Sequence, residues 1–251
     1  MSPLVGTTAL AARNLTKMRR NSASVIGAVV FPILFLVLFN TVLNRAMTGI
    51  GIDYVQYLPP AVTVQAMFFA AMSTAFYLTD DRASGVFARC RTLPIGRLSP
   101  LVARALADLT RAAVSLLVVL VVSMLLGFRF RAGVLPALGY GVLALGFALV
   151  LILGCGLVGL YAKNAETAVV LVEVPYLPVL MLSSAFVPAD RFPDWLEPVV
   201  QASPITKVVD ALRALSGGGP TASVLPTALV WCIGLAVVFL VVGARRMKVA
   251  M

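Results

Sequence analysis

The 251-residue sequence has no histidine, few charged residues and only three cysteines. Charged residues make up 12% of the chain and apolar residues 61%, whereas a soluble domain carries about 25% charged residues. Because so little polar surface cannot cover a water-soluble globule, the composition excludes a soluble enzyme and a nucleic-acid-binding domain. The absence of histidine removes Ser-His triads, HExxH zinc sites and most proton-relay chemistry. Cys90, Cys155 and Cys232 are odd in number and far apart, which argues against a disulfide framework.

The chain consists largely of long apolar runs. Six stretches lack Asp, Glu, Lys and Arg: 21–44, 54–79, 112–128, 132–162, 174–189 and 214–244. A helix that crosses about 30 Å of hydrocarbon needs about 20 residues. The run at 112–128 reaches that length with the preceding helical turn, and the run at 174–189 must begin near Glu166, which places Glu173 in the membrane. We predict an all-α membrane protein with six transmembrane helices.

The net charge of +10 indicates how these helices are oriented. Of the 20 Lys and Arg residues, 14 lie on the side that holds both termini and the loop between the second and third runs. Cytoplasmic loops are enriched in Lys and Arg. We therefore expect a multi-pass membrane protein with both termini in the cytoplasm. The basic charge is explained by topology and by contact with anionic membrane lipids, and it requires no nucleic acid.

Three segments outside the runs have patterns of their own. Residues 1–20 predict an amphipathic helix that lies on the lipid surface or in a groove of a partner protein. Residues 80–111 form a polar loop, which is either solvated or a docking element for a cytoplasmic partner, with Phe87 as its anchor. In the latter part of that loop, Ser99-Pro100 opens a helix that carries Arg104, Asp108 and Arg111 on one stripe.

The third segment, residues 185–221, is divided by several prolines. Ser203-Pro204 opens a helix, and Gly217-Gly218-Gly219-Pro220 ends it. The apolar residues of this helix share one face: Ile205, Val208, Val209, Leu212 and Leu215. The pattern predicts a hairpin on the outer side of the membrane, which serves either as an extracellular lid or as an interfacial anchor.

Within the runs, Glu173 is the residue that most needs an explanation. An ionisable group in the membrane is costly and usually faces a cavity or a partner; the alternative is that the helix begins late and Glu173 sits among the headgroups. In the second run, Met67, Phe68, Phe69, Met72 and Phe76 form a soft apolar surface that suits greasy ligands or ordinary packing. Gly154, Gly156 and Gly159 indicate close helix packing.

Four stretches, taken in order and spacing, resemble a known family. They are Ala61-Val62-Thr63-Val64-Gln65; Asp81-Arg82-x-x-Gly85 with Arg91-x-Leu93-Pro94; Gly127-Phe128-Arg129-Phe130; and Leu182-Ser183-Ser184-Ala185-Phe186-Val187-Pro188, continued through Pro193-x-Trp195-Leu196 to Pro204-Ile205-Thr206-x-Val208-Val209-Asp210-Ala211-Leu212-Arg213. With this order, nearly the whole chain resembles the membrane subunits of ABC type-2 exporters, the daunorubicin-resistance-like permeases in particular.

The resemblance implies one transmembrane domain over residues 1–251 with an interface helix at 1–20, a coupling loop at 80–111 and extracellular re-entrant helices at 185–221. It implies a location in the bacterial plasma (inner) membrane. It also implies pairing with a second permease, identical or homologous, and with two ABC ATPase subunits. The residues implied to couple to the ATPase are Asp80, Asp81, Arg82, Gly85, Val86, Phe87, Arg89, Arg91, Leu93 and Pro94. The residues implied to line the substrate pathway are Phe31, Phe35, Met67, Phe68, Met72, Phe76, Glu173 and Tyr176.

The lysines support one part of this interpretation independently. A P-loop needs Gly-Lys before Ser or Thr, and none of the four lysines follows a glycine. We therefore expect no catalytic residue, cofactor or metal on this chain, with ATP and magnesium held by the partner ATPase. The predicted function is a permease of an ATP-driven exporter for a lipophilic drug, polyketide or glycolipid, as in multidrug efflux and antibiotic resistance.

Two other classes of protein remain as alternatives. An ion-coupled secondary transporter would use Glu173, but such a protein calls for several buried carboxylates and an inverted repeat. An intramembrane enzyme would need catalytic groups that the runs do not supply.

Overall fold

The computed structural model describes residues 16, 22–49, 51, 53–86 and 99–250. Over these residues the regular structure is helical, with no strand, which confirms the all-α prediction. The helices are α2 (Ser22–Thr48), α3 (Tyr54–Ala83), α5 (Ser99–Leu125), α6 (Val134–Tyr161), α7 (Ala165–Met181), the 3₁₀ helix η1 (Ala189–Arg191), α8 (Glu197–Ala202), α9 (Pro204–Gly217) and α10 (Thr221–Ala250). The predicted interface helix at 1–20 lies outside the described residues.

Four helical segments are long and apolar enough to cross a membrane: Tyr54–Ala83, Val102–Leu125, Val134–Tyr161 and Thr221–Arg245. A fifth apolar segment, Val29–Arg45 in α2, is shorter. The described residues thus form a multi-pass membrane protein.

Two of the apolar runs do not correspond to single helices. The run at 214–244 is divided, because Gly218 adopts φ +80° and ends α9 before α10 begins at Thr221. The run at 174–189 does extend back, and α7 begins at Ala165 because the Asn164 side chain accepts a hydrogen bond from the Thr167 backbone N–H at 2.7 Å. It ends at Met181, and residues 182–189 of the run lie beyond it, close to the predicted start of the next segment at residue 185.

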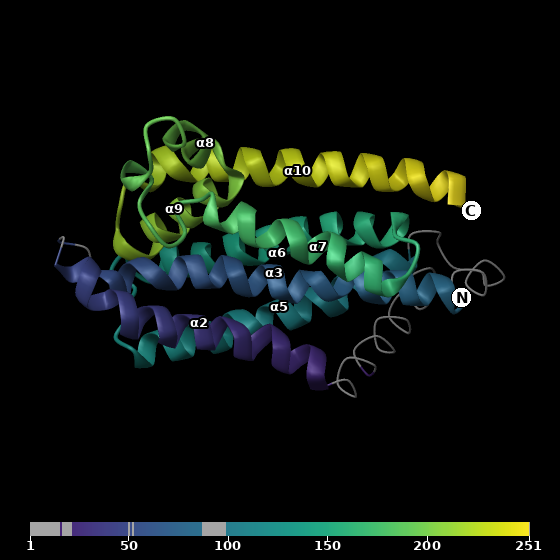
Figure 1. Ribbon diagram of the computed structural model, residues 1–251, viewed down its shortest axis with the longest axis horizontal. Coiled ribbons are helices and arrows are strands. Elements are labelled where there is room, and N and C mark those ends of the chain that lie inside the picture. Colours follow the sequence, from purple (N-terminus) through teal and green to yellow (C-terminus); the bar gives the residue numbers. More distant parts are fainter. Residues whose placement is uncertain (1–15, 17–21, 50, 52, 87–98, 251) are drawn as a thin grey trace.

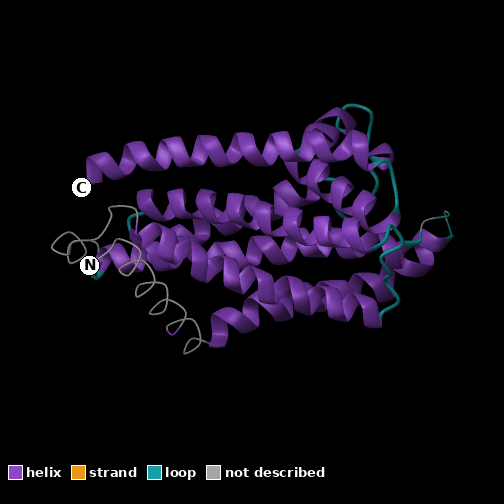
Figure 2. Ribbon diagram, turned by 180° about the vertical axis from the view of Figure 1, so that it is seen from behind, coloured by secondary structure: helices purple, strands orange, loops and turns teal. Residues whose placement is uncertain are grey.

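The long helices lie side by side along the longest axis, and the loops lie at the two ends of the bundle (Figure 2). One end, named here the α9 end, holds α8 and α9 (Figure 1). At this end Arg131 pairs with Asp53 at 3.0 Å, and the Arg131 backbone N–H donates to the Ser216 carbonyl. The opposite end, named the Arg82 end, holds the last turn of α3 and the last turn of α6, which Arg82 connects.

Helix α3 is the central helix, and it packs against α2, α5, α6, α7 and α9. It approaches α6 closely at Gly159. A Cβ atom added at Gly159 would lie 2.7 Å from the Ala75 carbonyl oxygen, so only glycine permits this contact. The Thr79 hydroxyl donates to the Gly159 carbonyl at 2.9 Å across the same contact. The prediction that this glycine marks close packing is confirmed.

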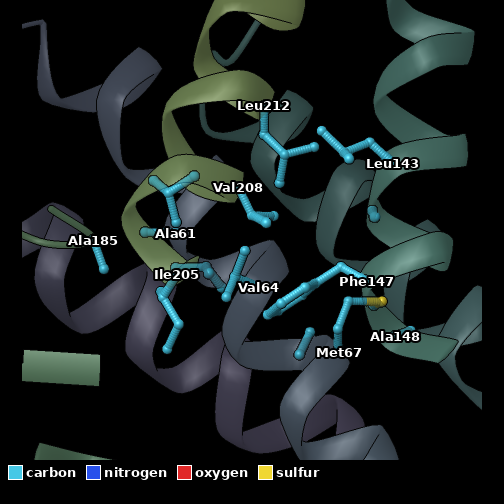
Figure 3. Close-up of a cluster of buried hydrophobic side chains, with 14 of the residues drawn as sticks. Ala61, Val64, Met67, Leu143, Phe147, Ala148, Ala185, Ile205, Val208 and Leu212 are labelled. Carbon is cyan, nitrogen blue, oxygen red and sulfur yellow. The ribbon is translucent and has the colours of Figure 1, made fainter. Parts of the chain in front are cut away.

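The apolar face predicted for α9 is buried against α3 and α6. Figure 3 shows Ile205, Val208 and Leu212 of α9 among side chains of α3 and α6, with Leu212 beside Leu143. Val208 and Leu212 are both 0% exposed. Burying a side chain of this size contributes about 1.5–3 kcal/mol, so this face holds α9 on the bundle.

Candidate functional site

A buried group of charges joins α3 to α5, and Asp108 is at its centre. Asp108 is 0% exposed. Its carboxylate accepts hydrogen bonds from Arg104 at 2.6 and 2.8 Å and from Arg111 at 2.5 Å. The Thr74 hydroxyl of α3 also donates to it, at 2.7 Å. The carboxylate thus receives bonds from its own helix and from the neighbouring one.

The two arginines make further contacts with α3. The Arg111 guanidinium donates to the Ala70 carbonyl at 2.6 and 3.2 Å. The central guanidinium carbon of Arg104 lies 4.1 Å from the centroid of the Tyr77 ring, within range for a cation–π interaction. We name the residues Ala70, Thr74, Tyr77, Arg104, Asp108 and Arg111 the α3–α5 clamp.

The clamp contains the charged stripe that the sequence predicted on the helix after Ser99-Pro100. Arg104, Asp108 and Arg111 do share one face, but that face is turned toward α3 and is buried. A solvated loop therefore does not describe these three residues. A buried charge is costly unless it is paired and hydrogen-bonded, and the contacts of the clamp meet that requirement.

Of the predicted coupling residues, those that the structure describes lie around the C-terminal end of α3, at the Arg82 end: Asp80, Asp81, Arg82, Gly85 and Val86. The Arg82 guanidinium donates to the carbonyls of Leu160, at 2.5 Å, and of Ala162, so it caps the end of α6. Asp81 is buried, and Asp80 and Val86 are half-buried. Gly85 adopts φ +72°, a conformation that favours glycine, just after α3 ends. Phe87, Arg89, Arg91, Leu93 and Pro94 lie outside the described residues.

At the α9 end, Arg213 joins three segments of the chain. Its guanidinium donates to the carbonyls of Ser184 and Ala185 at 2.9 and 2.8 Å and to the Tyr57 carbonyl at 3.2 Å. It also pairs with Asp210 at 3.1 Å. Burial lowers the pKa of the Arg213 guanidinium, while Tyr57 and Asp210 favour the charged form. α9, the chain after α7 and the start of α3 are therefore bonded to one side chain.

Ser184 adds a second set of bonds at this end. Its backbone N–H donates to the Thr206 hydroxyl at 3.0 Å, and its own hydroxyl donates to Asp210 at 2.9 Å. The Tyr57 hydroxyl donates to the Ser184 carbonyl at 2.8 Å. These bonds hold Ser184, three residues beyond the end of α7, against α9 and the first turn of α3.

The predicted pathway residues are only partly brought together. Phe68 of α3 stacks on Tyr176 of α7 with ring centroids 4.2 Å apart. Phe69 lies 5.3 Å from Tyr176 and 5.6 Å from Phe31 of α2, measured between centroids. We name Phe31, Phe68, Phe69 and Tyr176 the aromatic stack. It connects α2, α3 and α7.

The other predicted pathway residues do not belong to the aromatic stack. Met67 is fully buried in the core that α6 and α9 share with α3 (Figure 3). Met72 packs in a second apolar cluster. Phe35 stacks on Phe39 of its own helix, with centroids 5.4 Å apart. Phe76 is 38% exposed. Glu173 is exposed at the middle of α7, and no ion pair of Glu173 occurs within the described part of the chain.

Sequence reasoning did not find the roles of Thr74, Gln65 and Arg213. Thr74 carries no signal, since a threonine in an apolar helix is common. Gln65 is 1% exposed, and its Oε1 has no hydrogen-bond partner among the described residues. Arg213 ends one of the stretches that carried the resemblance, but only the structure reveals what it binds.

The described residues define a membrane protein without a metal cluster: no group of three Cys, Asp or Glu side chains in this part of the chain could hold an ion. The described helices form a multi-pass bundle with charged side chains buried between α3 and α5. The ABC-2 type transporter family matches residues 6–216, and the chain therefore belongs to that family.

Named relatives make the assignment narrower. The chain is 34% identical over 239 residues to the probable doxorubicin resistance ABC transporter permease protein DrrC of Mycobacterium tuberculosis, covering 93% of this chain and 86% of that protein. It is 30% identical over 229 residues to the daunorubicin resistance ABC transporter permease protein DrrB1 of Streptomyces coeruleorubidus, covering 90% and 80%. The chain is thus a permease subunit of an ABC transporter, which supports the predicted function and gives the ion-coupled alternative no support.

Proposed function

We propose that this permease exports a lipophilic, drug-like compound, with energy supplied by ATP hydrolysis on partner subunits. The identity of 34% over 93% of the chain to a doxorubicin resistance permease carries the proposal. The exposed apolar side chains of α2 and α7 support it, because such a surface faces lipid or another apolar partner. A lipophilic cargo would enter from the bilayer along this surface.

The proposal includes six spans. α2 has 27 residues and α7 has 17, which correspond to about 40 Å and 26 Å of helix. Added to the four long apolar segments, they give six crossings with both termini on the cytoplasmic side. α9 and its neighbours would then form the extracellular re-entrant segment, and residues 1–20 the interface helix.

Coupling to ATP would take place at the Arg82 end. The loop that follows α3 would contact two ATPase subunits, which hold ATP and magnesium, as the resemblance implies. Arg82 has partners in α6, so we assign it the role of joining that loop to α6 rather than only contacting the ATPase. Gly85, beyond the last turn of α3, would set the direction of the loop.

The substrate pathway would run beside the aromatic stack, between this permease and a second one, identical or homologous. Flat aromatic rings offer favourable contacts to apolar and aromatic compounds. The Gln65 Oε1 atom is available to accept a hydrogen bond if the helices separate. Phe31, Phe68, Phe69 and Tyr176 are therefore the residues that we assign first to the pathway.

The assembly can be tested by co-expressing the chain with ABC ATPases of the same organism and purifying the complex from membranes. We expect the chain alone to show no ATP hydrolysis and the complex to hydrolyse ATP. Doxorubicin, the drug in the name of a relative, is the first probe for stimulation of that hydrolysis. A chain that forms no complex with any ABC ATPase would contradict the proposal.

A further inference from the structure

The α3–α5 clamp occupies a defined place in a helical hairpin. α3 ends at Ala83 and α5 begins at Ser99, so residues 84–98 connect the two helices. Thr74 lies nine residues before the end of α3, and Asp108 lies nine residues after the start of α5. Each is therefore about 14 Å from the connecting segment. The hydrogen bond between Thr74 and Asp108 therefore joins the two helices at equal distances from the segment that connects them.

The bonds of the clamp fix one register between the helices. Asp108 bonds to Thr74, and Arg111 bonds to the Ala70 carbonyl one turn away. A slide of α5 along α3 by one turn, about 5.4 Å, would break both bonds at once. Because these groups are buried, no water is available to replace the lost partners.

Stability alone does not account for such a group. Replacing a buried ion pair by well-packed apolar residues is often neutral or stabilising. At the level of Ala75, the neighbouring contact of α3 with α6 is made by Gly159, Thr79 and apolar side chains, and the charged Arg82 bonds to α6 only at its C-terminal end. Apolar packing allows two helices to sit in more than one relative position. A group of buried, hydrogen-bonded charges selects one of these positions.

We propose that the clamp is a positioning element that makes α3 and α5 move as one body when the partner ATPase acts on the segment joining them. This inference rests on the proposed function. A push on residues 84–98 then reaches the aromatic stack, because Phe68 and Phe69 lie on α3 within two turns of Thr74. Without the clamp, the two helices slide and ATP is hydrolysed without movement of the pathway.

The test uses the complete complex in proteoliposomes and measures doxorubicin moved per ATP hydrolysed. Thr74→Val keeps the shape of the side chain and removes its hydroxyl, whereas Thr74→Ser keeps the hydroxyl. Thr110→Val is the matched control, since Thr110 is exposed on α5 and donates only to the Leu106 carbonyl of its own helix. Thermal unfolding and complex formation are measured for every variant.

We expect Thr74→Val to lower the transport-to-hydrolysis ratio roughly fivefold or more, with ATP hydrolysis retained. Thr74→Ser and Thr110→Val should keep the wild-type ratio. If Thr74→Val keeps the wild-type ratio, or if it lowers transport and hydrolysis in equal proportion, the clamp is only structural and the inference is wrong. If the wild-type complex moves no doxorubicin with ATP, the proposed export of drug-like compounds fails first, and this inference fails with it.

Discussion

The guanidinium carbon of Arg213 lies 3.5 Å from the centroid of the Tyr57 ring, and the same side chain donates to the Tyr57 carbonyl. One arginine of α9 thus holds both the ring and the backbone of a residue in the first turn of α3. A planar guanidinium can stack and donate at the same time, which an ammonium cannot. This contact connects the short helices of the α9 end to the central helix.

Arg213→Lys should therefore weaken the fold although the charge is kept. Lysine cannot stack on Tyr57 while donating to Ser184 and Ala185, and we expect a loss of about 1–3 kcal/mol in the free energy of unfolding. Thermal unfolding in detergent measures it. Arg191→Lys is the control, because its side chain is 54% exposed. Equal effects of the two substitutions would contradict the role assigned to Arg213.

Gly159→Ala should force α3 and α6 apart. The added methyl group meets the backbone of Ala75, which cannot move as a flexible side chain does. We expect a cost of about 1–3 kcal/mol, measured as a lower unfolding temperature. Gly146→Ala, also in α6, has open space around the new Cβ and should be nearly neutral or slightly stabilising. A harmless Gly159→Ala would show that the two helices do not approach this closely.

Asp108→Ala should be far more damaging than the removal of an exposed carboxylate. It leaves the Arg104 and Arg111 guanidiniums buried without their shared carboxylate, and breaking a buried pair in this way costs about 3–5 kcal/mol. The yield of folded protein and its unfolding temperature report the loss. Asp194→Ala, at an exposed loop position, is the comparison. The prediction fails if the two variants are equally stable.

Glu173→Gln should leave export unchanged. The side chain is exposed on α7 and is not enclosed by the described residues of its own chain, whereas an ion-coupled transporter calls for several buried carboxylates. Efflux is measured from cells that keep ATP while the proton gradient is collapsed. Loss of efflux on Glu173→Gln, or on collapse of the proton gradient, would favour the ion-coupled mechanism over the ATP-driven one.

Apolar patterning was enough to predict the helices but not all of their ends. The start of α7 followed from the length that a span requires, and the start and end of α9 followed from Ser203-Pro204 and from the glycines after Gly217. The end of α7 at Met181 lies four residues before the predicted start of the following segment at 185, and Ser184 and Ala185 just beyond it are bonded to Arg213. Contacts between distant segments have no signal in local periodicity.

The same limit applies to the candidate site. Arg104, Asp108 and Arg111 were correctly placed on one stripe, yet a charged stripe looks the same whether it faces water or another helix. The hydrogen bond from Thr74 of α3 to Asp108 shows that the stripe faces a helix. This bond can be found only once the packing of α3 against α5 is known. The aromatic stack was found in part, since Phe68 and Tyr176 were predicted separately but not as a contact.

The most direct test of the central claim is ATP-dependent transport by the purified complex in proteoliposomes without an ion gradient. Doxorubicin fluorescence inside the vesicles reports its movement, and a variant of the partner ATPase that cannot hydrolyse ATP is the control. We predict movement that requires ATP, this chain and an active ATPase together. Movement driven by a proton gradient in the absence of ATP would contradict the account.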